Sequence, residues 1–161
     1  CQSLAEDAGA GDKTWAAYLG TEVEGGRGAD ARGRIGDGPW HNAAGVLIAE
    51  DIDQLHLGPN IVRSTALDEN GDRVFGRGDP VNRHDILTGV MADGTAFFPD
   101  DADHTCNNWT SSDEGSASLG HFDRQGGGNT SWNAAHGSRS CSQADLAATG
   151  GDGLLYCFAT D

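Results

Sequence analysis

Basic side chains are scarce in this sequence. Lys13 is its only lysine, and lysine and arginine together number 10 against 25 acidic residues, which gives a net charge of −15. A surface with this charge repels the phosphate backbone of nucleic acids and anionic membranes, so we expect no nucleic-acid partner. A solvated acidic face is the simplest interpretation of the carboxylates. The alternative is that some of them collect cations such as calcium.

Long apolar runs are also missing. No stretch approaches the roughly 20 apolar residues that a membrane-spanning helix needs, so we expect no membrane insertion. The 161 residues suit one domain, 1–161, with a core of its own. The 25 glycines favour turns, loops and short strands over long helices. Because Cys1 falls within an expected helix, we expect a mature or trimmed product.

Familiar catalytic motifs are absent as well. The sequence contains no CxxC, HExxH or GxSxG motif and no glycine-rich phosphate loop after a strand. Its histidines also lack the spacing of a helical metal site. We expect all of them to be structural or exposed: His41, His56, His84, His104, His121 and His136. The sequence therefore predicts a protein that is not an enzyme.

Four cysteines are present, namely Cys1, Cys106, Cys141 and Cys157. Their even number, the scarcity of lysine and the loop-rich composition favour disulfides, and hence an exported protein. Three pairings are open, of which a nested one would tie the two chain ends together and staple an internal loop. Four buried thiols in a cytosolic protein and a lipidated Cys1 are the alternatives.

Apolar spacing and turn residues predict short elements throughout. Segment 1–11 has apolar residues at helical spacing, and 50–58 fits one or two further helical turns. Asn70-Gly71 and Asp93-Gly94 predict the tight turns of two hairpins. Segment 125–145 is expected to be irregular. The other expected strands are 13–23, 105–112, 116–124 and 153–161, the last of them central in a sheet and covered on both faces.

Several segments, taken in order, carry a family resemblance: "CQSLAEDAGAGDKTWAAYL", "RGADARGRIGDGPWHNAAGVLI", "ALDENGDRVF", "NRHDILTGVMADGTAF", "TCNNWTSS", "SWNAAHGSRSCS" and "GLLYCFA". The chain resembles the endostatin-like branch of the C-type lectin fold. It is most similar to the bacterial exported domains of unknown function related to that branch. Order, spacing and all four cysteines agree with the pattern.

The resemblance implies an α+β, C-type lectin-like (endostatin-like) fold with short twisted antiparallel strands, one or two short helices, long loops and two disulfides. It implies bridges from Cys1 to Cys157 and from Cys106 to Cys141. The second bridge would anchor the loop 107–140 to the sheet, with Trp109 near it in the core.

The sequence departs from the family at its metal sites. Sugar-binding C-type lectins hold calcium with a Glu-Pro-Asn or Gln-Pro-Asp triplet and a later Trp-Asn-Asp triplet, and this chain has neither. Trp132-Asn133 is followed by Ala134. Nothing near Cys1 matches the N-terminal histidine cluster that binds zinc in endostatin. The resemblance therefore implies neither metal site here.

The densest acidic cluster is the loop with Asp100, Asp101 and Asp103, next to His104. Hard cations bind several oxygen ligands, so these carboxylates are candidate calcium ligands. A solvated loop is the alternative, and no cofactor is required by the sequence.

The long loop before Cys141 offers a candidate ligand site. An exposed aromatic ring with amide and guanidinium groups suits sugar stacking and hydrogen bonds to hydroxyls. Burial of Trp132 in the core is the alternative. The candidate residues are Trp132, Asn133, His136 and Arg139.

These observations lead to a functional expectation. We expect a secreted or cell-surface, non-enzymatic recognition module that binds glycan or protein, for example in cell adhesion or in an extracellular matrix. The alternative is a structural role through self-assembly, as a subunit of an extracellular polymer or a domain of a larger surface protein.

Overall fold

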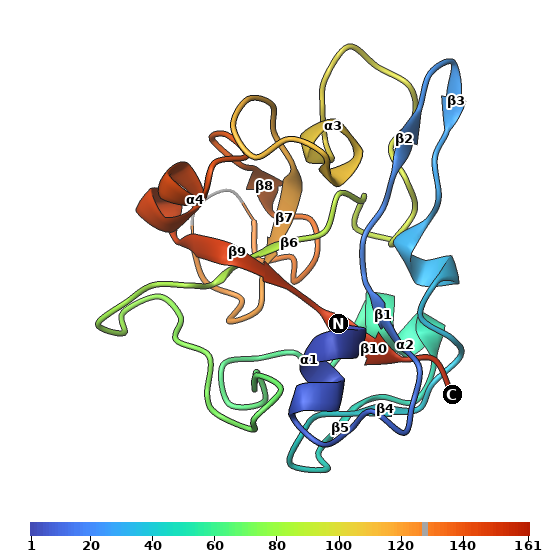
Figure 1. Ribbon diagram of the computed structural model, residues 1–161, viewed down its shortest axis with the longest axis vertical. Helices are drawn as coiled ribbons and strands as arrows, with labels where there is room; N and C mark the ends of the chain where they lie inside the picture. Colours follow the sequence, from blue (N-terminus) through green and yellow to red (C-terminus); the bar gives the residue numbers. More distant parts are fainter. Residues whose placement is uncertain (127–128) are drawn as a thin grey trace.

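A four-stranded sheet forms one half of the molecule in the computed structural model, which describes residues 1–126 and 129–161 (Figure 1). Its strand order is β8-β7-β6-β9. The pairs β6–β7 and β7–β8 are antiparallel, whereas β9 runs parallel to β6. The strands are β6 (Asp85–Leu87), β7 (Ser118–His121), β8 (His136–Gly137) and β9 (Gly151–Leu155).

Three two-stranded ladders make up the rest of the sheet structure. The ladder β1–β10 lies beside the N-terminal helix and close to both chain ends (Figure 1). These ladders pair β1 (Trp15–Ala17) with β10 (Cys157–Ala159), β2 (Glu22–Val23) with β3 (Gly26–Arg27), and β4 (Trp40–His41) with β5 (Leu47–Ala49). The chain is thus α+β with short, mostly antiparallel strands and long loops.

The closing apolar segment differs from its predicted form. It divides into β9 and β10, which belong to different sheets. Moreover, β9 is an edge strand of its sheet, so the prediction of one central strand over 153–161 was wrong. Apolar composition indicated burial correctly for Phe158, which is 7% exposed, but it could not indicate where the chain changes sheets.

The helices are short, and side chains cap two of them. The predicted helices are confirmed as α1 (Gln2–Asp7) and α2 (Ile52–Leu57). A further helix, α4 (Gln143–Thr149), overlaps the segment expected to be irregular. The Asp51 carboxylate accepts from the first turn of α2, and the Ser142 hydroxyl does the same in α4. A 3₁₀ turn, η1, spans Ala31–Gly33.

Both disulfides implied by the resemblance are confirmed. Cys1 is bonded to Cys157 across 156 residues, and Cys106 to Cys141 across 35. Two structural disulfides indicate an oxidising compartment. Within the described ranges, no helix combines the length and the apolar character needed to cross a membrane.

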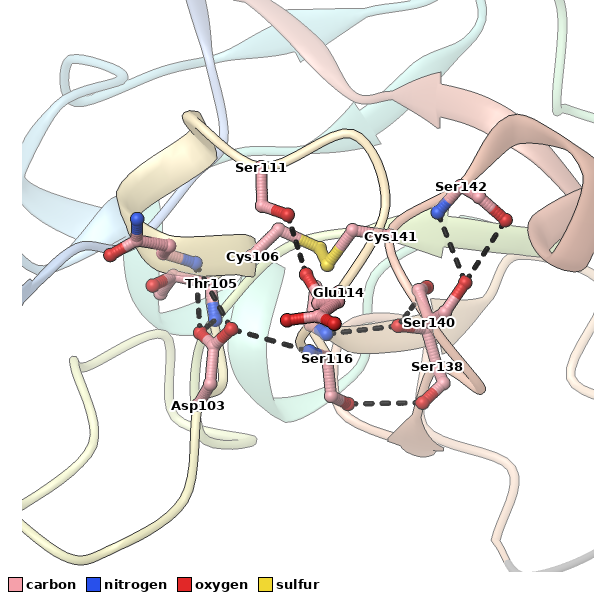
Figure 2. Close-up of a disulfide and its surroundings, with 12 residues drawn as sticks. Asp103, Thr105, Cys106, Ser111, Glu114, Ser116, Ser138, Ser140, Cys141 and Ser142 are labelled. Carbon is pink, nitrogen blue, oxygen red and sulfur yellow. Dashed lines mark hydrogen bonds between the residues drawn. A yellow bond between two sulfur atoms is a disulfide. The ribbon is translucent and has the colours of Figure 1, made fainter.

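The segment around Cys106 is not the predicted strand. It forms α3 (Cys106–Trp109), a left-handed turn with φ values of 51°, 52°, 53° and 64°. This conformation costs roughly 1–2 kcal/mol for each L-residue, so other contacts must hold it. The Trp109 indole donates to Gly20 O at 2.7 Å, and the Asn108 amide exchanges two hydrogen bonds with the Glu22 backbone. The disulfide fixes its first residue (Figure 2).

A polar chain crosses the main core. Asn133 Nδ2 donates to the Tyr18 hydroxyl at 3.0 Å, and that hydroxyl lies 2.7 Å from His56 Nε2. His56 Nδ1 is 2.7 Å from Ile52 O, so this nitrogen carries the hydrogen and Nε2 accepts from Tyr18. Burial raises the pKa of the Tyr18 hydroxyl, which keeps it a donor. The polar atoms of Asn133 are therefore committed to the core.

Candidate metal centre

Strand pairing brings two histidines and an aspartate together. Asp85 on β6 stands directly opposite His121 on β7 in the antiparallel register, so both side chains project from the same face. His84 precedes β6, and one ligand atom from each of the three side chains lies within 4.8 Å of the others. His136 on the neighbouring β8 reaches the same place. In the described part of the chain, this is the one group of three or more His, Cys, Asp or Glu residues with such spacing.

The distances within the cluster match those between ligands of one metal ion. Nε2 of His84 and Nε2 of His121 each lie 3.2 Å from Asp85 Oδ1. Ligand atoms about 2.0–2.1 Å from a tetrahedral zinc ion are about 3.3 Å apart. His136 Nε2 is farther from Asp85 Oδ1, at 3.8 Å, and its side chain is 40% exposed. We therefore take His84, Asp85 and His121 as the primary ligands and His136 as a residue at the rim.

The Asp85 carboxylate is buried without a hydrogen-bond donor. Its side chain and that of His121 are each 1% exposed. Neither Asp85 oxygen accepts a hydrogen bond from any described residue, so the two 3.2 Å contacts lack hydrogen-bond geometry. An ionised carboxylate in such a place costs several kcal/mol unless a cation compensates it. The buried carboxylate without a donor is therefore what a binding site for a cation would provide.

A second carboxylate orients the His84 ring. Asp123 Oδ1 lies 3.1 Å from His84 Nδ1, so Nδ1 carries the hydrogen and the Nε2 lone pair faces Asp85. Asp123 is held in turn by the backbone N–H groups of Gln125 and Arg77, at 3.0 and 2.8 Å. His136 Nδ1 is likewise 2.9 Å from Gly137 O. Carboxylate or carbonyl partners of this kind accompany most metal-binding histidines.

A cavity of about 460 Å³ opens over the imidazoles. The rings of His84 and His121 are stacked, with centroids 4.2 Å apart. Gly126, at φ +121°, lies against both rings, and a Cβ there would be 2.9 Å from His121 Cε1 and 3.2 Å from His84 Cε1. A side chain at this position would therefore press on the cluster. The cavity is lined by Arg77, Asn82, His84, His121, Gly126, His136 and Thr149.

The ligand residues predicted in the long loop do not form one site. Trp132 is 2% and Asn133 is 1% exposed, so the expected stacking of Trp132 on sugar is wrong and its burial in the core is confirmed. Arg139 is exposed and lies 3.6 Å from Asp145, and it does not line the cavity. Of the four, His136 alone belongs to the cluster.

The predicted calcium ligands also have other roles. The Asp100 carboxylate contacts His104 Nε2 at 3.1 Å, and the hydrogen bond from the Ala102 N–H holds the pKa of Asp100 below its usual value. Asp101 is exposed. The carboxylates of Asp100, Asp101 and Asp103 do not gather around a common point within the described chain. The carboxylates of Asp100 and Asp103 instead accept hydrogen bonds from backbone N–H groups, so the structure does not gather the predicted calcium ligands.

Asp103 supports the left-handed turn beside the disulfide (Figure 2). Its carboxylate accepts from the backbone N–H groups of Thr105 and Asn107, each at 3.0 Å, and of Ser116 at 3.3 Å. These bonds connect the segment before α3 to α3 itself and to Ser116, which lies two residues before β7.

Replacing this carboxylate is expected to destabilise the fold. Asp103→Asn leaves N–H groups unsatisfied and should lower the free energy of unfolding by roughly 1–3 kcal/mol. Exposed Asp101 provides the matched control, and Asp101→Asn should change stability little. Urea unfolding with and without millimolar calcium measures both effects. A calcium-dependent gain in wild-type stability that Asp103→Asn removes would restore the calcium hypothesis.

Sequence reasoning missed His84, Asp85, His121 and Asp123. "RHDIL" and "GHFD" both lie in predicted strands, and each joins a histidine to an aspartate within three positions. That signal becomes informative only when the register places Asp85 opposite His121.

Comparisons with protein-family models, curated protein sequences and solved structures found no match to this chain.

Proposed function

We propose that this chain is an exported recognition domain that holds one zinc ion at His84, Asp85 and His121 and uses it to bind an external ligand. The observation that carries the proposal is the buried Asp85 carboxylate, which has two imidazole nitrogens at 3.2 Å and no hydrogen-bond donor among the described residues. One divalent ion compensates the carboxylate and both lone pairs.

The chemistry of the donors favours zinc over calcium. Imidazole nitrogen with a single carboxylate suits zinc and its neighbours in the first transition series, whereas calcium takes six to eight oxygen ligands. Three protein ligands are also the number that leaves a zinc coordination position open. The open position and the cavity above it together suit ligand recognition.

The rest of the proposal concerns fold and location. A C-type lectin-like, endostatin-like architecture is supported by the nested disulfides and by the short-stranded α+β structure. A secreted or cell-surface setting is supported by the same disulfides. Binding of glycan or protein is supported by the cavity beside the cluster, whose lining offers the polar side chains of Asn82, Arg77 and His136.

The test of the proposal begins with metal binding by the full chain. Protein stripped with a chelator is titrated with zinc, and bound metal is counted by mass spectrometry. We expect one zinc ion per chain, with a dissociation constant in the nanomolar to low micromolar range. A stripped chain that binds no zinc would refute the metal centre.

Ligand recognition is tested next on a glycan array and a panel of extracellular proteins. The zinc-loaded and stripped chains are compared, and binding by the loaded form alone supports the proposal. Self-association that is seen by light scattering and is indifferent to zinc would instead support assembly as the function.

A further inference from the structure

Arg77 lines the cavity without an acidic partner. In a chain with net charge −15, its guanidinium forms no ion pair with any described residue. Nearby Arg63 and Arg73 instead share Asp79, at 2.5 and 3.1 Å. The Arg77 backbone is fixed, because its N–H donates to Asp123 and its carbonyl accepts from Arg63. Arg77 is thus an exposed arginine whose anchored backbone holds it at the lining of the cavity.

We propose that the cavity binds a carboxylate, with one oxygen on the metal and Arg77 donating to the carboxylate group. This inference rests on the proposed function, since it requires the metal at His84, Asp85 and His121. A guanidinium matches a carboxylate with two parallel N–H donors. The bound carboxylate occupies the coordination position that the three protein ligands leave open.

Charge and size restrict the ligand further. A polyanion is repelled by the net charge of −15, whereas a single carboxylate needs one local positive site. A cavity of about 460 Å³ lies in the size range of small-molecule sites. Asn82 at the lining adds an amide for hydrogen bonds to the body of the ligand. A sugar acid and the C-terminus of a polypeptide both present this chemistry.

The experiment uses the zinc-loaded full chain and three probes. D-Glucuronate represents a sugar acid, N-acetylalanine represents a polypeptide C-terminus, and D-glucose is the neutral control. Binding is measured by calorimetry, and the cobalt-substituted chain reports by its visible spectrum whether the probe reaches the metal. We expect at least one carboxylate to bind and to shift the cobalt spectrum, and glucose to do neither. The carboxylate probe that binds the chain more tightly shows whether the ligand is a sugar acid or the C-terminus of a polypeptide.

Variants separate the role of Arg77 from that of the metal. Arg77→Gln should keep zinc affinity and weaken carboxylate binding about tenfold or more. Arg34→Gln removes the same charge at an exposed position outside the cavity and should change neither. His136→Gln should also keep zinc affinity, because His136 is a rim residue.

Three results would overturn the inference. One is equal binding of carboxylate to wild type and Arg77→Gln. Another is equal binding of glucose and carboxylate, and the third is carboxylate binding that leaves the cobalt spectrum unchanged. Failure of the proposed function is seen separately, because zinc binding is measured before any probe is added.

Discussion

Asp85→Asn is expected to abolish the thermal stabilisation that zinc gives the wild-type chain. A ligand present at 100 times its dissociation constant stabilises the folded state by about 2.7 kcal/mol. For a chain of 161 residues this raises the melting temperature by roughly 5–10 °C. The asparagine has nearly the same shape but no charge, so the variant should show little or no shift.

The same substitution has a second expected effect, of opposite sign, in the absence of metal. The stripped wild-type chain buries the Asp85 carboxyl group without a hydrogen-bond donor, whereas the amide of Asp85→Asn can donate to an imidazole nitrogen that faces it. The stripped variant should therefore be at least as stable as the stripped wild type. If Asp85 only held the two imidazoles in place, the variant would be less stable without metal and would keep its zinc shift.

Two further variants complete this test. His121→Gln removes a primary ligand and should also lose the zinc shift. His41→Gln changes an exposed histidine on β4, outside the cluster, and should keep it. Scanning calorimetry with chelator and with zinc measures all four proteins. A shift retained by His121→Gln but lost by His41→Gln would place the metal elsewhere.

Local signals in the sequence predicted some elements and missed others. The α1 and α2 helices follow from apolar spacing that needs no partner strand. The α4 helix was missed although its signals are local: Ser142 caps its first turn, Asp145 lies within that turn, and Gly150 ends it at φ 115°. Attention to capping residues would have found it.

The candidate metal centre could not be predicted, for a different reason. Its ligands come from β6, β7 and the residue before β6, and His136 comes from β8. Each strand has two to four residues, so alternation along one strand says little about which residues oppose each other. The register of strands that are more than 30 positions apart in sequence creates the site.

The left-handed turn illustrates a third limit. Residues of "CNNW" lack glycine, and asparagine is the sole type among them with a marked tendency toward positive φ. The strand prediction for 105–112 took no account of partners outside the segment. Tertiary contacts decide its form, since Asp103, Gly20 and Glu22 all bind the turn.

Replacing Cys106 and Cys141 together by alanine is expected to have a large effect on stability outside the metal centre. Closing a loop across 35 residues removes unfolded-state entropy worth about 4 kcal/mol in the chain-entropy model. The left-handed turn then loses the bond that fixes its first residue. We expect urea unfolding to show a loss of about 3–4 kcal/mol.

The local consequence distinguishes this turn from an ordinary loop. Without the disulfide, the residues of α3 can leave the left-handed region and relieve their backbone strain, and the indole bond from Trp109 to Gly20 should then weaken. Hydrogen exchange at the Trp109 indole N–H should accelerate in the double variant. Zinc binding should persist under native conditions, because the bridge contributes no ligand. A double variant with protected Trp109 and full stability would show that Asp103 and Glu22 alone hold the turn.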